Sequence, residues 1–242
     1  MSWQWSAWGK HPAFKDYFQL GATNPLSSGM VEWMRSGYAQ IKIDQGKFFS
    51  WRFWMRGLGK QGLACGLLRD SSDGLGRSYP ILLMGIGSLP HWEKNWDLLP
   101  IAFEACWNQM ESLTAKSFKT LKDFEEEVMK IPSPAESWEK MAQRREQKGE
   151  RDLQMIEAQV RQNLAQDPFF ITLDQTLAGD PIILISFYHY FWRKGGETIP
   201  NSIFMGGSLN KTFLAFYRRP LLPKDFSDLW SDSWPGKQAR EA

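Results

Sequence analysis

The sequence predicts a protein of the α/β class, and three patterns support this. Residues 49–55 place apolar side chains at every second position, which is the period of a strand. Residues 79–86 form a nearly continuous apolar run, which suits a strand covered on both faces. Met30, Met34 and Tyr38 recur at helical spacing. A chain of 242 residues is long enough to bury a substantial core around such elements.

The chain opens with a predicted short strand at residues 3–8. Asn24-Pro25 marks a turn, and Ser27 or Ser28 is expected to cap the helix that follows. The apolar spacing predicts that this helix runs for about four turns and ends at Ile41.

A hairpin is predicted next. The strand at residues 49–55 leads through the glycine-rich residues 57–62 to a second strand at residues 63–68. A polar loop at residues 69–77 then precedes the apolar strand at residues 79–86.

The middle of the chain is predicted to be helical. One helix covers residues 97–113 with Pro100 in its first turn, and another covers residues 117–130. Residues 136–166 are the most polar long segment, and their apolar stripe predicts two helices or one broken helix.

One element near the C-terminus stays ambiguous. Asp180-Pro181 resembles a helix start, yet residues 182–190 are rich in strand formers, and we favour the helix only slightly. The other predicted elements are strands at residues 169–173, 202–205 and 212–217, a helix at residues 222–230, and a disordered tail at residues 231–242.

Composition argues against several classes of protein. The net charge of +2 is too small to indicate nucleic acid or a membrane surface as the main partner. Cys65 and Cys106 have apolar neighbours and are expected to be buried thiols. With no signal-peptide pattern and no membrane-length apolar run, we expect a cytoplasmic protein. Most of the 13 tryptophans should fill the core, with partial exposure expected for those flanked by charge, Trp54, Trp92 and Trp96.

The segment from Trp8 to Pro12 could suggest a phosphate-binding loop because Lys10 follows Gly9. The fuller Gly-x-x-x-x-Gly-Lys-Ser/Thr pattern is missing, since His11 stands after the lysine. We therefore interpret the segment as a tight turn in which Gly9 adopts a special backbone conformation and Lys10 points to solvent.

The loop from Asp70 to Pro80 faintly resembles a calcium loop, but Ile81 stands where the bidentate glutamate would be. We expect Asp73 to accept local backbone N–H groups and Gly76 to allow a close approach. Arg77 is expected to form a forked ion pair, with Asp16 as one candidate partner. If that pair is buried, losing one partner would be costly.

Catalytic and metal sites are weakly indicated. His11, His91 and His189 lie far apart without metal-ligand spacing, so we expect no metal or cofactor. An alternative function is a hydrolase acting on phosphorylated protein, with His11, Asp16, Asp73 and Arg77 as its reacting groups. This alternative requires the four groups to lie within hydrogen-bond reach of one another around a pocket.

Several motifs, taken in order, resemble the TagF family (also called ImpM), which accompanies bacterial type VI secretion systems. The matching segments are Trp8-Gly9-Lys10-His11-Pro12, Asp16-Tyr17-Phe18, Trp51-Arg52-Phe53, the loop residues Ser71, Asp73, Gly76, Arg77, Tyr79 and Pro80, the strand Ser202-Ile203-Phe204-Met205, and Leu222-Pro223-Lys224-Asp225-Phe226. The sequence departs from the family where Lys15 precedes Asp16 and where Phe204 and Met205 replace paired tryptophans.

This resemblance implies a three-layer α/β/α sandwich, whose central sheet we expect to be mixed and partly antiparallel, in one domain over residues 1–230. It also implies a cytoplasmic, non-enzymatic repressor that acts after translation, binds a scaffold with a forkhead-associated (FHA) domain and opposes a threonine-phosphorylation pathway. A structural subunit of the secretion machine is a further alternative. The residues expected to hold the fold or touch the partner are Trp8, Gly9, Lys10, Pro12, Asp16, Trp51, Ser71, Asp73, Gly76, Arg77, Pro80 and Ser202.

Overall fold

The computed structural model describes residues 2–41, 47–59, 61–148, 153–174, 180–196 and 198–231. The predicted disordered tail, residues 231–242, lies outside these ranges except for Ser231. Within the polar segment 136–166, residues 149–152 also lie outside these ranges.

In the described part of the chain, eight strands form one sheet in the order β2-β1-β5-β4-β3-β7-β8-β6. The strands are β1 (Gln4–Gly9), β2 (Phe18–Leu20), β3 (Phe49–Arg56), β4 (Leu63–Arg69), β5 (Ile81–Gly87), β6 (Phe169–Thr172), β7 (Ser202–Ser208) and β8 (Lys211–Tyr217). Every pair of neighbouring strands is antiparallel, so the expected mixed sheet is wrong. Short connections explain this for pairs such as β3–β4 and β7–β8, because a few residues can join antiparallel strands but not parallel ones. The pairs β1–β5, β3–β7 and β6–β8 come from distant parts of the chain, and only the tertiary structure sets their direction.

The predicted hairpin is confirmed by the pairing of β3 with β4, in which Phe53 faces Gly66. The apolar run before Gly87 is also confirmed as a strand, β5, which lies between β1 and β4. Residues 81–85 of β5 are buried, as expected for a strand whose two faces are both covered. A continuous apolar run therefore marked an interior strand of the sheet, although the sheet is antiparallel.

The helices confirm the predicted helical segments with shifted ends. They are α1 (Pro25–Tyr38), α2 (Leu99–Ala115), α3 (Leu121–Val128), α4 (Trp138–Lys148), α5 (Leu153–Asn163), α6 (Pro181–Lys194) and α7 (Pro223–Leu229), with short 3₁₀ turns η1 (Trp92–Lys94) and η2 (Trp96–Leu98) before α2. The ambiguous segment is helical: the Asp180 side chain accepts from the N–H groups of Ile182 and Ile183 at the start of α6.

The predicted cap of α1 is wrong by about one turn. The side chain of Asn24 accepts from the N–H groups of Leu26 and Ser27 at 3.0 Å each. The Ser27 hydroxyl in turn accepts from the N–H of Asn24, which completes a capping box. The helix therefore begins at Pro25, where a proline at the first helical position leaves no N–H unsatisfied.

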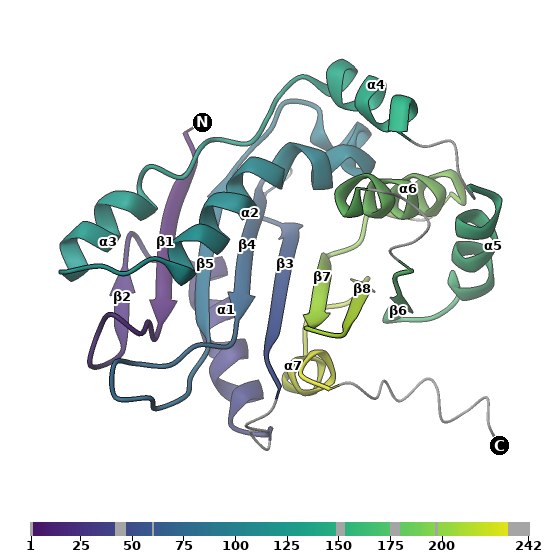
Figure 1. Ribbon diagram of the computed structural model, residues 1–242. Coiled ribbons are helices and arrows are strands. Elements are labelled where there is room, and N and C mark those ends of the chain that lie inside the picture. The colour runs from purple at the N-terminus through teal and green to yellow at the C-terminus, as the bar shows by residue number, and fades with distance from the viewer. Residues whose placement is uncertain are drawn as a thin grey trace, which may run out of the picture.

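Helices lie against both faces of the sheet, with α2 in front and α1 behind in the view of Figure 1. One hydrophobic cluster joins residues of the sheet to α2, α3 and α6, and includes Trp54, Phe103 and Trp192. A second cluster joins the sheet to α1 and α7, through residues such as Trp33 and Phe226. Burial of apolar side chains in these two clusters holds the helices to the sheet.

The expected partial exposure of Trp54, Trp92 and Trp96 is wrong, because all three are at most 2% exposed. Their rings pack against one another, and Trp54 and Trp96 also contact the ring of His189. The neighbouring charges in the sequence point elsewhere: Asp97, for example, accepts from the guanidinium groups of Arg145 and Arg193. Both cysteines are buried free thiols, as predicted.

Candidate functional site

The end of β1 and the loop at residues 70–80 form one corner of the molecule, which we call the β1 corner. Gly9 ends β1 with φ of 115°, as predicted for a special backbone conformation. A Cβ at this position would lie 2.1 Å from the carbonyl oxygen of Pro80. Only glycine permits this approach, so Gly9 lets the turn after β1 pack directly on the loop.

The carboxylate of Asp73 organises the β1 corner. It accepts from the backbone N–H groups of Leu75 and Arg77 at 3.0 Å each and from Arg77 Nε at 2.7 Å. The ammonium group of Lys10 lies 3.0 Å from the same carboxylate. Burial opposes ionisation, but the hydrogen bonds from Lys10 and Arg77 outweigh it and hold the pKa of Asp73 well below its usual value. The predicted turn role of Asp73 is confirmed.

Lys10 does not point to solvent, which corrects the prediction. Its residue is 4% exposed, and its ammonium also donates to the carbonyl oxygen of Arg77 at 3.3 Å. The same group lies 4.6 Å from the centre of the Tyr17 ring. The loop at residues 70–80 folds back over the turn after β1 and covers Lys10. The residues next to the lysine, 8–12, contain no pattern that would predict this burial.

Arg77 and Asp16 do meet, but not as the buried pair whose loss would be costly. Their charged atoms are 4.0 Å apart, and the side chains are 54% and 75% exposed. Arg77 instead makes close bonds to Asp73 and, through Nη2, to the carbonyl oxygen of Lys15 at 2.7 Å. Solvent screening makes an exposed contact of this kind worth little to stability.

His11 is held in a structural role at the same corner. Its Nδ1 accepts from the N–H of Ala13 at 3.1 Å, so the proton belongs on Nε2, which donates to the carbonyl oxygen of Leu113. Its ring packs against Phe118 and Phe124, and burial lowers the pKa of the imidazole. Both ring nitrogens are engaged, which leaves neither free to act as a general base.

The surface of the β1 corner carries aromatic and apolar side chains. Tyr17 and Leu75 are exposed. The ring of Tyr17 contacts Tyr79 at 4.8 Å between centroids, and Tyr79 contacts Tyr38 of α1 at 5.0 Å. From the sequence, Tyr38 was expected only as part of the apolar spacing of a helix, and Leu75 was not singled out. The motif aromatics Tyr17 and Tyr79 were the signals for this surface.

The remaining motif residues are distributed over the molecule. Pro80 is buried beneath Gly9, Pro12 is exposed, and the carbonyl oxygen of Ser71 accepts from the N–H of Tyr79 at 3.0 Å. Gly76 is not a point of close approach: a Cβ there would meet nothing within 4 Å, and φ of +77° explains the glycine instead. Trp8, Trp51 and Ser202 are buried in the sheet and lie outside the corner, in β1, β3 and β7.

Within the described part of the chain, no group of three or more His, Cys, Asp and Glu side chains is arranged to hold a metal ion. The helices in those ranges are all too short or too polar to cross a bilayer.

Comparison with known proteins relates the chain to one family. The family model "TagF N-terminal domain, Type VI secretion system-associated" matches residues 6–131, which is more than half of the chain. The crystal structure of PA0076 from Pseudomonas aeruginosa PAO1 has a similar fold, with a TM-score of 0.52 and 15% sequence identity, over 96% of this chain and 95% of that one. A comparison with curated proteins finds no match. The family match covers β1 to α3, including the whole β1 corner, and the chain therefore belongs to the TagF family of type VI secretion system-associated proteins.

Proposed function

We propose that this chain is a non-enzymatic regulator of a bacterial type VI secretion system. In this proposal it acts in the cytoplasm, after translation, as a repressor that binds a scaffold protein with an FHA domain. Membership of a secretion-associated family supports the general role. We further propose that residues 1–230 form a single three-layer α/β/α domain, since separate hydrophobic clusters cover the two faces of one sheet.

The observation that carries the proposal is the state of the charged groups at the β1 corner. Lys10, Asp73 and Arg77 bond to one another, and both nitrogens of His11 are engaged by the backbone. A hydrolase would need its reacting groups to be free and to surround a substrate, whereas the fourth group of that alternative, Asp16, is 75% exposed at the surface. The corner therefore fits a scaffold for docking better than a reacting centre.

The exposed side chains of the corner are of the kinds that anchor protein interfaces. Tyr17 and Leu75 are exposed beside the half-exposed guanidinium of Arg77. Tyrosine and arginine are enriched among the residues that dominate binding energy. The network around Asp73 holds these side chains on a rigid base, which lowers the entropy lost on binding. We propose that the partner docks here and is thereby kept from assembling.

The test places a charge in this surface. Leu75→Asp should weaken binding of the purified cognate FHA-domain scaffold at least tenfold and raise secretion in cells towards the level of a gene deletion. Burying an unpaired carboxylate in an interface opposes binding, whereas the fold should persist because the Leu75 side chain is exposed. Leu209→Asp, at another exposed leucine, between β7 and β8, is the matched control and should bind normally.

Three results would contradict the proposal. A gene deletion that leaves secretion unchanged would remove the regulatory role. Equal binding by the Leu75→Asp and Leu209→Asp variants would remove the docking surface. Copurification with the secretion machine in a fixed ratio would favour a structural subunit instead.

A further inference from the structure

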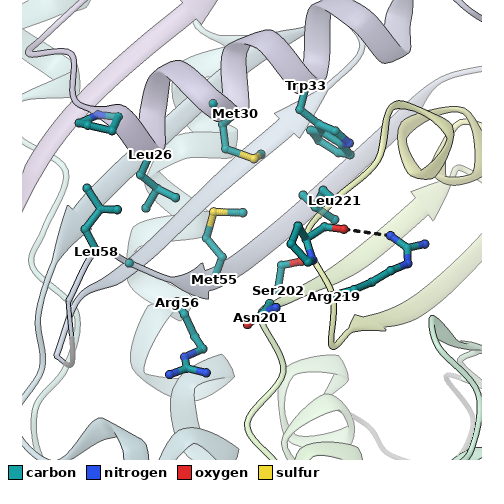
Figure 2. Close-up of a pocket in the computed structure, with 14 residues that line it drawn as sticks. Leu26, Met30, Trp33, Met55, Arg56, Leu58, Asn201, Ser202, Arg219 and Leu221 are labelled. Atoms are coloured by element: carbon teal, nitrogen blue, oxygen red, sulfur yellow. Dashed lines mark hydrogen bonds between the residues drawn. The ribbon is translucent and has the colours of Figure 1, made fainter.

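A second surface feature lies at the end of the sheet where β3 ends and β7 begins. It is a groove of about 550 Å³ between α1, these strand ends and the segment that follows β8. Figure 2 shows Leu26, Met30 and Trp33 of α1 on one side, facing Met55 of β3. Leu221, just before α7, closes a further part of the wall. The size suits an apolar group larger than a single side chain.

The apolar surface continues beyond the groove. Leu58 at the rim and Leu222, next to Leu221, are both exposed large hydrophobic residues. Contiguous apolar surface of this kind on a protein commonly marks an interaction site. Met30 and Met55 in the wall are flexible side chains that adapt to different occupants.

A glycine in α1 has no explanation in the packing of the fold. Gly29 lies inside the helix, where glycine is unfavourable relative to alanine, and a Cβ there would meet nothing within 4 Å. By contrast, Gly37 of the same helix is required, since its Cβ would lie 2.2 Å from Phe226. Gly29 lines the groove, and its missing side chain leaves the groove open.

The wall also contains a buried hydroxyl group without a partner. Ser202 is 2% exposed, and its Oγ has no hydrogen-bond partner among the described residues. Leaving a buried hydroxyl unsatisfied is costly, so an occupant that bonds to it would gain from this group. Ser202 is one of the motif residues that lie outside the β1 corner.

Among the described residues that line the groove, the charged ones are Arg56 and Arg219, and none is a carboxylate. Arg219 is partly exposed and bonds to Asp225 at 2.6 and 2.8 Å. Arg56 extends from the end of β3 away from Met30, so it stands at the rim. No described carboxylate forms an ion pair with Arg56. Because Asp225 already neutralises Arg219, Arg56 is the group that favours negative charge on whatever covers the rim.

We propose that this groove docks an acidic amphipathic segment of a partner protein. Its apolar side chains enter between Met30, Met55 and Leu221, a polar group meets Ser202, and a carboxylate reaches Arg56. This inference rests on the proposed function, in that the chain acts by binding proteins, but it assigns a second contact away from the β1 corner.

The test uses a displayed library of random 14-residue peptides, selected against the purified full-length chain. Selected peptides should combine Leu, Ile or Phe with Asp or Glu, and should bind Gly29→Leu at least tenfold more weakly. Ser28→Leu, at the adjacent exposed residue that does not line the groove, is the matched control and should bind as the parent chain does. Arg56→Glu should also weaken binding tenfold, and Lys211→Glu, on exposed β8 surface, should not.

Gly29→Leu should fold, because space is open at its Cβ, and an unchanged or raised thermal midpoint would verify this. The proposal is overturned by selected peptides that are basic, that bind Gly29→Leu normally, or that are no more enriched than against an inert protein. It is also overturned if native mass spectrometry finds a copurified small molecule that Gly29→Leu loses, or a dimer that Gly29→Leu dissociates.

Failure of this inference is separable from failure of the proposed function. If deletion of the gene raises secretion and Gly29→Leu still represses fully, the regulatory role stands and the groove contact is wrong. If deletion has no effect on secretion, the proposed function fails whatever the peptides show.

Discussion

His189 shows how the fold sets the chemistry of a single residue. Its imidazole is fully buried between Trp54, Trp96 and Phe216. Trp54 Nε1 donates to its Nε2 at 3.1 Å, and its Nδ1 donates to the carbonyl oxygen of Ile185 at 2.8 Å. Burial lowers the pKa of His189 to about 3, so the side chain is neutral at physiological pH. Its hydrogen bond with Trp54 links β3 to α6 within the core.

The pKa of His189 leads to a prediction about pH. In the unfolded chain this histidine takes up a proton below about pH 6.5, whereas the folded chain resists protonation until about pH 3. The free energy of unfolding should therefore fall by about 1.4 kcal/mol per pH unit through this window from His189 alone. His189→Gln keeps an acceptor for Trp54 but takes up no proton. The free energy of unfolding of this variant should therefore fall less steeply with falling pH, by about 1.4 kcal/mol per pH unit. Urea unfolding at pH 7, 6, 5 and 4 measures it, and parallel slopes for the two proteins would contradict it.

At the scale of elements, α1 illustrates two uses of glycine in one helix. Gly37 allows α7 to pack closely, with Phe226 lying against the place where a Cβ would stand. The indole N–H of Trp33 donates to the carbonyl oxygen of Leu222 at 2.8 Å and fixes the start of α7. Gly29 has no such neighbour and borders the groove. The contact between α1 and α7 therefore depends on one glycine and not on the other.

Alanine substitutions at the two glycines should have opposite effects. Gly37→Ala should destabilise the fold by about 1–3 kcal/mol, because the new methyl group overlaps Phe226 in a packed interface. Gly29→Ala should stabilise it by about 0.5–1 kcal/mol through helix propensity alone. Chemical denaturation of both variants measures the difference. Equal effects would show that the spacing of α1 and α7 is not set at Gly37.

At the scale of the whole molecule, the two halves of the chain share one sheet. The family match ends at residue 131, just after α3. The strands β7 and β8, which lie beside β3 in the sheet, come from residues 202–217 and are therefore outside the match. Helix α6 supplies much of one hydrophobic cluster, and α7 completes the other. Neither cluster is closed without residues beyond the family match.

A fragment of residues 1–131 should consequently fail to fold on its own. Removing β7 would turn β3 into an exposed edge strand, and it would uncover Trp51 and Phe53. The fragment should show poor dispersion of backbone amide NMR signals and no cooperative thermal transition, while residues 1–231 should show both. A dispersed spectrum and cooperative unfolding of the fragment would contradict this interdependence.

Local patterns predicted most elements because they depend on neighbours in the chain. The period of residues 49–55 predicted β3, the apolar run predicted β5, and Asp180-Pro181 indicated the start of α6 despite its strand-forming residues. The same patterns could not predict that Lys10 and Trp54 are buried. The groups that cover them, such as Asp73 for Lys10 and Trp96 for Trp54, come from distant segments of the chain.

The sequence by itself determined the class of fold, the order of the elements and the family. These follow from the spacing of apolar residues and from short motifs such as Trp8-Gly9-Lys10, which are local properties of the chain. Only the tertiary structure decided that the sheet is wholly antiparallel, that Asp73 bonds to Lys10, and that Gly29 and Ser202 share one groove. Those outcomes depend on which distant segments pack together and bury their apolar surface, and this packing is a property of the whole folded chain.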